Sequence, residues 1–163
     1  MAKTIISADR ARELLVYDKD TGIFRWRITK GGNAKAGAVT GCQNGNGYLR
    51  IRVDGHLWHA HRLAWLMVYG SMPEEIDHIN GDRADNRIAN LRNGTHTQNM
   101  QNMRGPTVTS SHGWMGVTRA GKRWRACIRV NGKEVLLGRF ETQVIAHVAY
   151  IEAKRQLHAF CSI

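Results

Sequence analysis

Asp77 and His78 stand side by side in the chain, and a polar loop and two further asparagines follow them. Histidine is the side chain best suited to deprotonating water near neutral pH. Hard cations such as Mg²⁺ prefer oxygen ligands, which an aspartate carboxylate and an asparagine carbonyl supply. Together these residue types predict hydrolysis of a phosphodiester, with the histidine acting on water and a cation stabilising the leaving 3′ oxygen.

Short elements are expected to hold this pair. The segment "EIDHI" predicts a strand, "NGDRADNRIAN" a polar loop and "LRN" a second strand, and Thr95 is expected to cap a helix over "HTQNMQNM". Successive residues of a strand point to opposite faces. Asp77 and His78 can therefore serve one site only where the strand bends or ends.

The stretch "IDHINGDRADNRIANLRNGTHTQNMQN" resembles the HNH endonuclease motif, in the variant common among phage-encoded and homing nucleases. The preceding segment, including "HRL" at residues 61–63, is similar as well, so the resemblance covers about residues 15–103. It implies a ββα-metal unit in which Asp77 ligates the metal and His78 is the general base. By the same resemblance Asn90, 12 residues after His78, braces the loop that holds the base, and Asn99, 21 residues after His78, completes the metal site.

The metal follows from two departures from the family pattern. Many HNH enzymes have histidine where this chain has Asn99, and many carry CxxC pairs that bind structural zinc, which this chain lacks. Both departures favour one Mg²⁺ or Mn²⁺ ion over Zn²⁺ at the site and imply no structural zinc.

Two alternatives stay open near this motif. Asn86 competes with Asn90 for the bracing role. A cluster of histidines upstream suggests a metal site but is more typical of hairpin surface and packing; its members are His56, His59 and His61.

The last part of the chain predicts a small sheet with one helix. Three strands are expected over "GWMGVTRA", "RWRACIRV" and "KEVLLGRF", with Asn131-Gly132 as a hairpin turn. A helix is expected over "ETQVIAHVAYIEAKRQLH". Its apolar face is predicted from Ile145, Val148, Ala149 and Leu157.

This segment resembles an AP2-type DNA-binding domain through its "WRACIR", "LGRF" and "AHVAYIEAKRQLH" elements. In that family the three-stranded sheet lies in the major groove. Alternation places Trp124, Ala126 and Ile128 toward the helix and the intervening residues toward DNA. The DNA-binding residues expected are Arg119, Lys122, Arg123, Arg125, Arg129 and Lys133. Thr118 stands where the family has an arginine, so base specificity does not carry over.

Charge supports a polyanionic partner. The chain has 24 Lys+Arg against 13 Asp+Glu, a net charge of +11 and a pI of about 10.2. Residues 1–103 carry 14 basic and 10 acidic side chains, whereas residues 104–163 carry 10 basic and 3 acidic side chains. The second part is therefore the better candidate for binding phosphates. Double-stranded DNA is the expected partner. A membrane is not expected, because no apolar run reaches about 18 residues. The start of the chain does not resemble a signal peptide, and the three cysteines are far apart, so the cytoplasm is the expected location.

We therefore expect an α+β protein. An HNH nuclease domain is predicted at residues 1–103, with its ββα-metal core at about 74–103, followed by a linker at 104–110 and an AP2-like domain at 111–160. The expected activity is metal-dependent hydrolysis of double-stranded DNA by a phage-encoded or homing endonuclease. The alternative is a sequence-specific DNA-binding protein whose nuclease site has decayed. RNA binding is disfavoured because exposed stacking aromatics are few.

Overall fold

The computed structural model describes residues 6–32, 34–103, 105 and 113–162, which fold as two compact units spanning residues 1–95 and 96–163. Apart from Gly105, the predicted linker at 104–110 lies largely outside the described residues, and the predicted domain boundary stays a prediction. Within the described ranges, no helix has the length and apolar character needed to cross a membrane.

The first unit begins with a short helix and a hairpin. Helix α1 (Ala8–Leu14) starts at Ser7, whose hydroxyl accepts a hydrogen bond from the Arg10 N–H at 3.1 Å. Strands β1 (Leu15–Tyr17) and β2 (Phe24–Trp26) then pair antiparallel. Both elements contribute buried side chains to the core of this unit.

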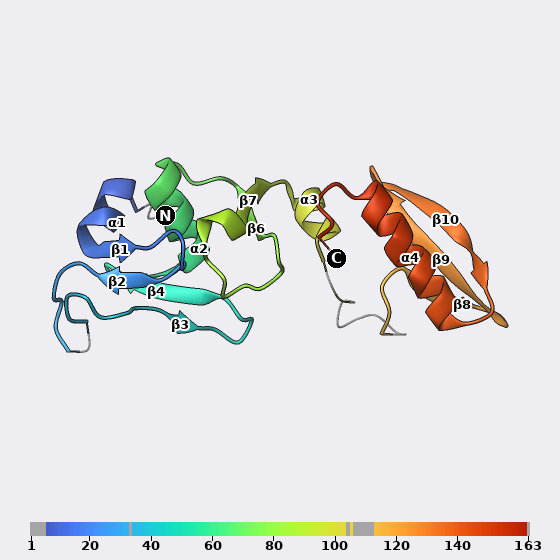
Figure 1. The fold of residues 1–163 in the computed structure, drawn as a ribbon, viewed down its shortest axis with the longest axis horizontal. Helices are drawn as coiled ribbons and strands as arrows, with labels where there is room; N and C mark the ends of the chain where they lie inside the picture. The colour runs from blue at the N-terminus through green and yellow to red at the C-terminus, as the bar shows by residue number, and fades with distance from the viewer. Residues whose placement is uncertain (1–5, 33, 104, 106–112, 163) are drawn as a thin grey trace. The chain divides into compact units, whose positions relative to one another are not determined.

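A three-stranded sheet and a second helix complete the core. Strands β3 (Cys42–Gln43), β4 (Leu49–Val53) and β5 (His56–His59) lie in that order in the sheet. Helix α2 (Ala60–Tyr69) ends at Gly70, whose φ of 75° is left-handed. Helix α1 packs against α2, and α2 against β4 and β5 (Figure 1).

The segment that bears the Asp-His pair has the predicted order of strand, loop, strand and helix. Strands β6 (Glu75–His78) and β7 (Leu91–Gly94) pair antiparallel, and the single-turn helix η1 (Ile88–Asn90) closes the loop between them. Helix α3 (His96–Gln101) follows in the chain and belongs to the second unit. Strand β6 ends at His78, which is where the sequence required it to end or bend.

The β1–β2 turn supports the loop between β6 and β7. The Tyr17 hydroxyl donates to the Asn86 carbonyl at 2.7 Å, and the Ile88 N–H donates to the Lys19 carbonyl at 3.0 Å. At Gly22, which has φ 73°, an added Cβ would lie 2.6 Å from the backbone nitrogen of Arg87. Glycine is required here both for its backbone conformation and for the close approach of the loop.

Replacing Gly22 with alanine is therefore expected to lower the free energy of unfolding by about 2–4 kcal/mol, combining left-handed strain with a steric clash. Gly55→Ala is the matched control, because Gly55 has φ 82° but open space around its Cβ position. Its loss should be limited to about 1–2 kcal/mol. Urea denaturation of both variants measures the difference, and equal losses would show that the loop does not press on Gly22.

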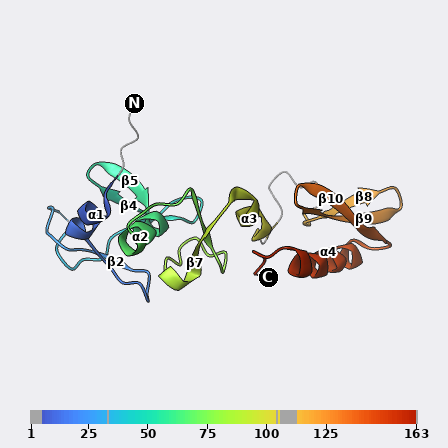
Figure 2. The ribbon, with the colours of Figure 1, turned by 90° about the horizontal axis from the view of Figure 1, so that it is seen from above.

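Beyond α3, the second unit contains the predicted sheet backed by one helix. Strands β8 (Val117–Ala120), β9 (Arg123–Val130) and β10 (Lys133–Phe140) form an antiparallel sheet in the order β10-β9-β8. Helix α4 (Gln143–Leu157) begins at Thr142, whose hydroxyl accepts from the Ile145 N–H at 3.3 Å, and it lies along one face of the sheet (Figure 2).

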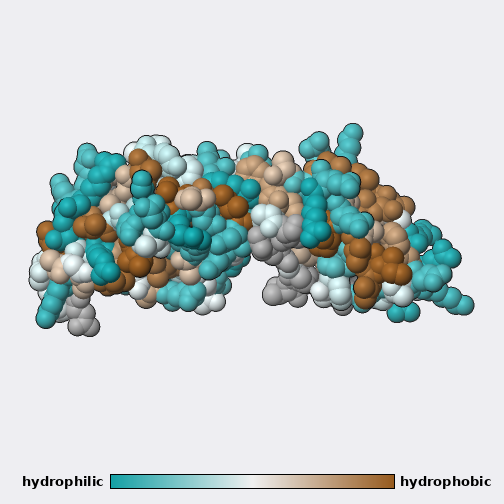
Figure 3. Space-filling model, viewed as in Figure 1, coloured by the Kyte–Doolittle hydropathy of each residue, from teal (hydrophilic) through white to brown (hydrophobic). Residues whose placement is uncertain are grey.

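The prediction of the buried face of α4 was wrong. The helix buries Ala146, Tyr150 and Lys154, while Ile145 and Val148 are 51% and 50% exposed. Hydrophobic side chains gather on the surface of this unit in Figure 3, and the exposed apolar residues of α4 are Val144, Ile145, Val148 and Leu157. The inward-facing side chains of the sheet explain the difference, because only a residue as small as Ala146 fits closely against them. The Tyr150 ring lies against Gly116.

Candidate functional site

The Asp-His pair lies at the end of β6, in a hairpin that directs the two side chains differently. His78 pairs with Leu91 in the β6–β7 register and is buried, with 4% of its surface exposed. Asp77 pairs with Arg92, whose Nη2 and Nε donate to the Asp77 Oδ2 at 2.8 and 3.1 Å. A guanidinium therefore already balances the charge of the carboxylate that the sequence predicts to bind metal.

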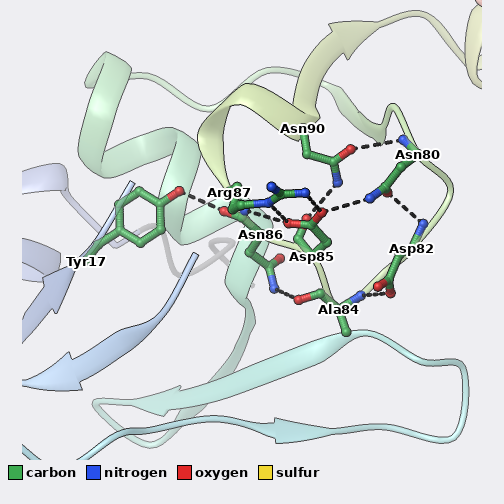
Figure 4. Close-up of polar contacts among 8 residues, drawn as sticks. All are labelled: Tyr17, Asn80, Asp82, Ala84, Asp85, Asn86, Arg87 and Asn90. Carbon is green, nitrogen blue, oxygen red and sulfur yellow. Dashed lines mark hydrogen bonds and ion pairs between the residues drawn. The ribbon is translucent and has the colours of Figure 1, made fainter. Parts of the chain in front are cut away.

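Asn90 joins the two ends of the loop that follows His78. Its Oδ1 accepts from the Asn80 N–H at 2.9 Å, and its Nδ2 donates to the Asp85 carbonyl at 2.9 Å (Figure 4). Its own carbonyl accepts from the Ile79 N–H at 2.8 Å. This geometry is what a loop-bracing residue requires.

The loop between these ends is held by its own polar side chains. Asn80 Oδ1 accepts from the Asp82 N–H at 2.9 Å, and Asp82 Oδ1 accepts from the Ala84 N–H at 2.9 Å. Asp85 Oδ2 accepts from Asn80 Nδ2 at 2.8 Å and from Arg87 Nη2 at 2.6 Å (Figure 4). The abundance of Asn and Asp in this segment is thus explained by loop structure, since such side chains bond to nearby backbone groups.

Acid should weaken this loop through Asp85. The hydrogen bond from the Arg87 side chain lowers the pKa of Asp85 to about 2. A carboxyl with a lowered folded-state pKa stabilises the fold above its unfolded pKa of about 3.9, and this contribution is lost as pH falls toward about 2. Wild type should exceed Asp85→Asn in free energy of unfolding by about 1–2 kcal/mol at neutral pH, and the gap should close across that window. Urea denaturation at several pH values tests this expectation; a gap that does not change with pH would contradict it.

Asn86 is buried in the same loop. It is 1% exposed, and its Nδ2 donates to the Ala84 carbonyl at 2.8 Å. Burial lowers the pKa of His78, while the Asn86 side chain and the nearby aspartates act in the opposite direction. Of the two asparagines left open by the sequence, Asn90 bonds to both ends of the loop, whereas the Asn86 Oδ1 is buried without a hydrogen-bond partner among the described residues.

Three further rings form a cluster with His78, and sequence reasoning did not bring them together. The His61 ring meets the His78 ring edge to face, with 5.0 Å between centroids, and stacks on His59 at 5.3 Å. The Tyr48 ring lies 5.1 to 6.0 Å from all three imidazoles. Burial lowers the pKa of His61 to about 3 and lowers that of His59 as well, so both rings are neutral at neutral pH. His56, in contrast, is exposed on the hairpin.

The predicted metal-binding residues lie in different units. Asp77 lies in the first unit, and Asn99 lies on α3 in the second. Among the described residues, no group of three or more His, Cys, Asp or Glu side chains is arranged to hold a metal ion. The assignment of Asn99 as a metal ligand stays a prediction.

The sheet of the second unit turns a basic face outward. Ala126 and Ile128 of β9 are buried, whereas Arg123 and Arg129 are exposed on the opposite face. Arg125 shares the outward face but forms an ion pair with Glu134, with Nη2 and Oε1 2.6 Å apart. Lys122 and Lys133 are exposed beside the strand ends.

Two arginines of this sheet differ from expectation. Arg119 pairs with Trp124 in the β8–β9 register, and its guanidinium lies 5.3 Å from that ring, on the face turned toward α4. Arg139 was missed by sequence reasoning, yet it pairs with Arg125 and is exposed. A bulge between Leu136 and Gly138 shifts the register of β10, so simple alternation could not place Arg139 on the basic face.

Comparison with known families agrees with the motif. The family model described as HNH endonuclease matches residues 59–101, a range that includes His59, His61, Asp77, His78, Asn90 and Asn99. No curated protein and no solved structure matches the chain. The chain therefore contains an HNH endonuclease domain at residues 59–101.

Proposed function

We propose that this chain is a metal-dependent endonuclease that hydrolyses phosphodiester bonds in double-stranded DNA, with His78 as the general base. The observation that carries the proposal is the place of His78 within the matched HNH domain: it is buried at the end of β6, next to Asp77 in the chain, and burial lowers its pKa. A neutral imidazole is the form that can accept a proton from water. The homing type and a phage origin rest on the resemblance of residues 15–103 alone.

Asp77 and Asn99 would hold one divalent cation, Mg²⁺ or Mn²⁺. Their donors are a carboxylate and a carboxamide oxygen, a set that suits a hard cation. When bound, the cation would stabilise negative charge on the leaving 3′ oxygen. Asn90 keeps the loop closed and Asn86 would orient the His78 ring, so both would act on the geometry of the base.

The second unit would bind DNA through the basic face of its sheet, in keeping with its resemblance to AP2-type domains. The face carries Arg123, Arg125 and Arg129, together with Arg139. Of the other predicted contacts, Lys122 and Lys133 flank this face, whereas Arg119 is held against Trp124 and is the weakest candidate.

A second function is favoured by one observation. The Asp77 carboxylate is paired with Arg92, which is an arrangement that a DNA-binding protein with a decayed nuclease site would tolerate. Incubating supercoiled plasmid with the chain in Mg²⁺ and in EDTA separates the two functions. A nuclease relaxes or linearises the plasmid only with the metal, whereas a decayed site binds the plasmid and leaves it intact in both.

The sheet also gives a quantitative expectation. Each lost phosphate contact lowers the slope of log affinity against log salt by about 0.9. Arg129→Ala should lower that slope by about this amount, and Arg125→Ala by less, because Glu134 already offsets the Arg125 charge. Arg155→Ala, on the exposed side of α4, is the control. Binding to a DNA duplex across a salt series tests this, and an unchanged slope in the double variant of Arg125 and Arg129 would show that the face is merely solvated.

A further inference from the structure

Arg50 on β4 lacks the partners that other arginines of the first unit have. Its Nε is buried without a hydrogen-bond partner among the described residues, and none of their carboxylates pairs with it. Arg10 instead pairs with Asp54, and Arg62 donates to the carbonyls of Pro73 and Glu74 at 3.0 and 3.2 Å. A buried guanidinium nitrogen without an acceptor is costly, and an anionic ligand would supply the acceptor.

The surroundings of Arg50 include two imidazoles whose ring nitrogens can donate. Arg50 is the cross-strand partner of His59, so both side chains lie on the same face of the β4–β5 hairpin. The Nδ1 atoms of His59 and His61 are also buried without a hydrogen-bond partner in the described part of the chain. Arg50 and Arg62 both add to the lowering of the pKa of His59, as positive neighbours would. The cluster therefore offers cations and imidazoles to a ligand that must supply the oxygens.

This cluster is continuous with the candidate base. Tyr48 lies two residues before Arg50 on the same face of the hairpin, and its ring contacts those of His59 and His78. The His61 ring bridges the remaining distance, because it touches both His59 and His78. An anion held at Arg50 would consequently lie beside the place where His78 acts.

We propose that Arg50 and His59 form a phosphate-binding subsite that receives a DNA backbone phosphate flanking the bond that is cut. The proposal rests on the proposed function for the identity of the polyanion. Arginine suits this role because its planar fork can hold two phosphate oxygens at once. His61 lines the subsite as a neutral ring between the bound phosphate and His78.

Phosphate neutralisation tests the subsite. The full chain with His78→Ala keeps DNA uncut, and a short DNA duplex with single methylphosphonates at successive positions removes one backbone charge at a time. At one position near the cut, neutralisation should weaken binding about tenfold, the effect of losing a charged hydrogen-bonded contact. Adding Arg50→Ala should abolish that sensitivity, since the same contact cannot be lost twice.

Arg52→Ala is the matched control. Arg52 lies two residues further along β4 on the same face, and its Nη1 donates to the Gly55 carbonyl at 3.1 Å. This control should keep the sensitivity to the methylphosphonate. Equal sensitivity with and without Arg50, at every position, would overturn the subsite. If Arg50→Ala proves unstable to heat, Arg50→Lys serves instead, and it should reduce the sensitivity without removing it; undiminished sensitivity there would overturn the subsite too.

If the proposed nuclease function is wrong, the experiments give a different result. In that case the wild-type chain leaves plasmid intact in Mg²⁺, while the coupling between Arg50 and one phosphate persists in binding. The subsite would then stand as a DNA contact in a protein that does not cut. A chain that cuts DNA but shows no coupling would reject the subsite and leave the nuclease proposal in place.

Discussion

His78→Ala is expected to lower the rate of DNA cleavage by about 10²- to 10⁴-fold, the usual cost of losing a general base. DNA affinity should stay close to that of wild type, because His78 is buried and the basic sheet lies in the other unit. Single-turnover cleavage at saturating protein, together with binding to the same duplex, measures the two effects separately.

His56→Ala is the control for this prediction. His56 lies in the same unit but is exposed on the β4–β5 hairpin, away from the four-ring cluster formed by Tyr48, His59, His61 and His78. It should cut at the wild-type rate. A His78→Ala chain that also cuts at the wild-type rate would remove His78 from the role of base.

Asp77→Asn is expected to raise the Mg²⁺ concentration needed for half-maximal cleavage by at least about tenfold. The carboxamide keeps the shape of the side chain but offers a dipole in place of a charge. Asn99→Ala should raise the requirement less, because it removes only a neutral donor. Cleavage rates over a series of Mg²⁺ concentrations provide the measurement.

Arg92→Ala separates metal binding from the ion pair. Both Asp77→Asn and Arg92→Ala weaken the pair between Asp77 and Arg92, whose side chains are 15% and 21% exposed, so both should lower the free energy of unfolding. Only Asp77→Asn removes the carboxylate that would bind the cation. If the two variants share the same metal titration, the effect of Asp77 comes from the ion pair alone.

Local structure was predictable where neighbours in sequence decide it. Ser7 and Thr142 cap their helices, Gly70 ends α2, and Asp54-Gly55 turns the hairpin with both φ angles positive, at 47° and 82°. The order of strand, loop, strand and helix around His78 also followed from local turn and strand signals. These features depend on a few adjacent residues, so periodicity and turn chemistry suffice.

The surroundings of His78 were not predictable in the same way. Tyr48, His61 and His78 come from three separate elements and meet only because the hairpin and α2 pack beside β6. No residue spacing in the sequence predicts that these three side chains come together. Asn86 and Asn90 posed a related difficulty, since two asparagines in one loop have the same chemistry and only the folded loop shows which one bonds to both of its ends.

In the second unit, packing overrode hydrophobicity. The sequence ranks Ile145 and Val148 above Ala146, yet the sheet accepts Ala146 and Tyr150 and leaves the branched residues exposed. The bulge in β10 likewise places Arg139 on the basic face against simple alternation. Packing between the helix and the sheet decided both outcomes, and such packing cannot be predicted from the sequence of a single segment.

The most direct test of metal-dependent hydrolysis is the chemistry of the cut ends, measured after a single turnover in water labelled with heavy oxygen. If activated water attacks the phosphorus and the 3′ oxygen leaves, the products carry a 3′-hydroxyl and a 5′-phosphate that contains the label, and they form with Mg²⁺ but not with EDTA. Intact DNA in Mg²⁺, cutting that persists in EDTA, or a 5′-phosphate without label would contradict hydrolysis at this site.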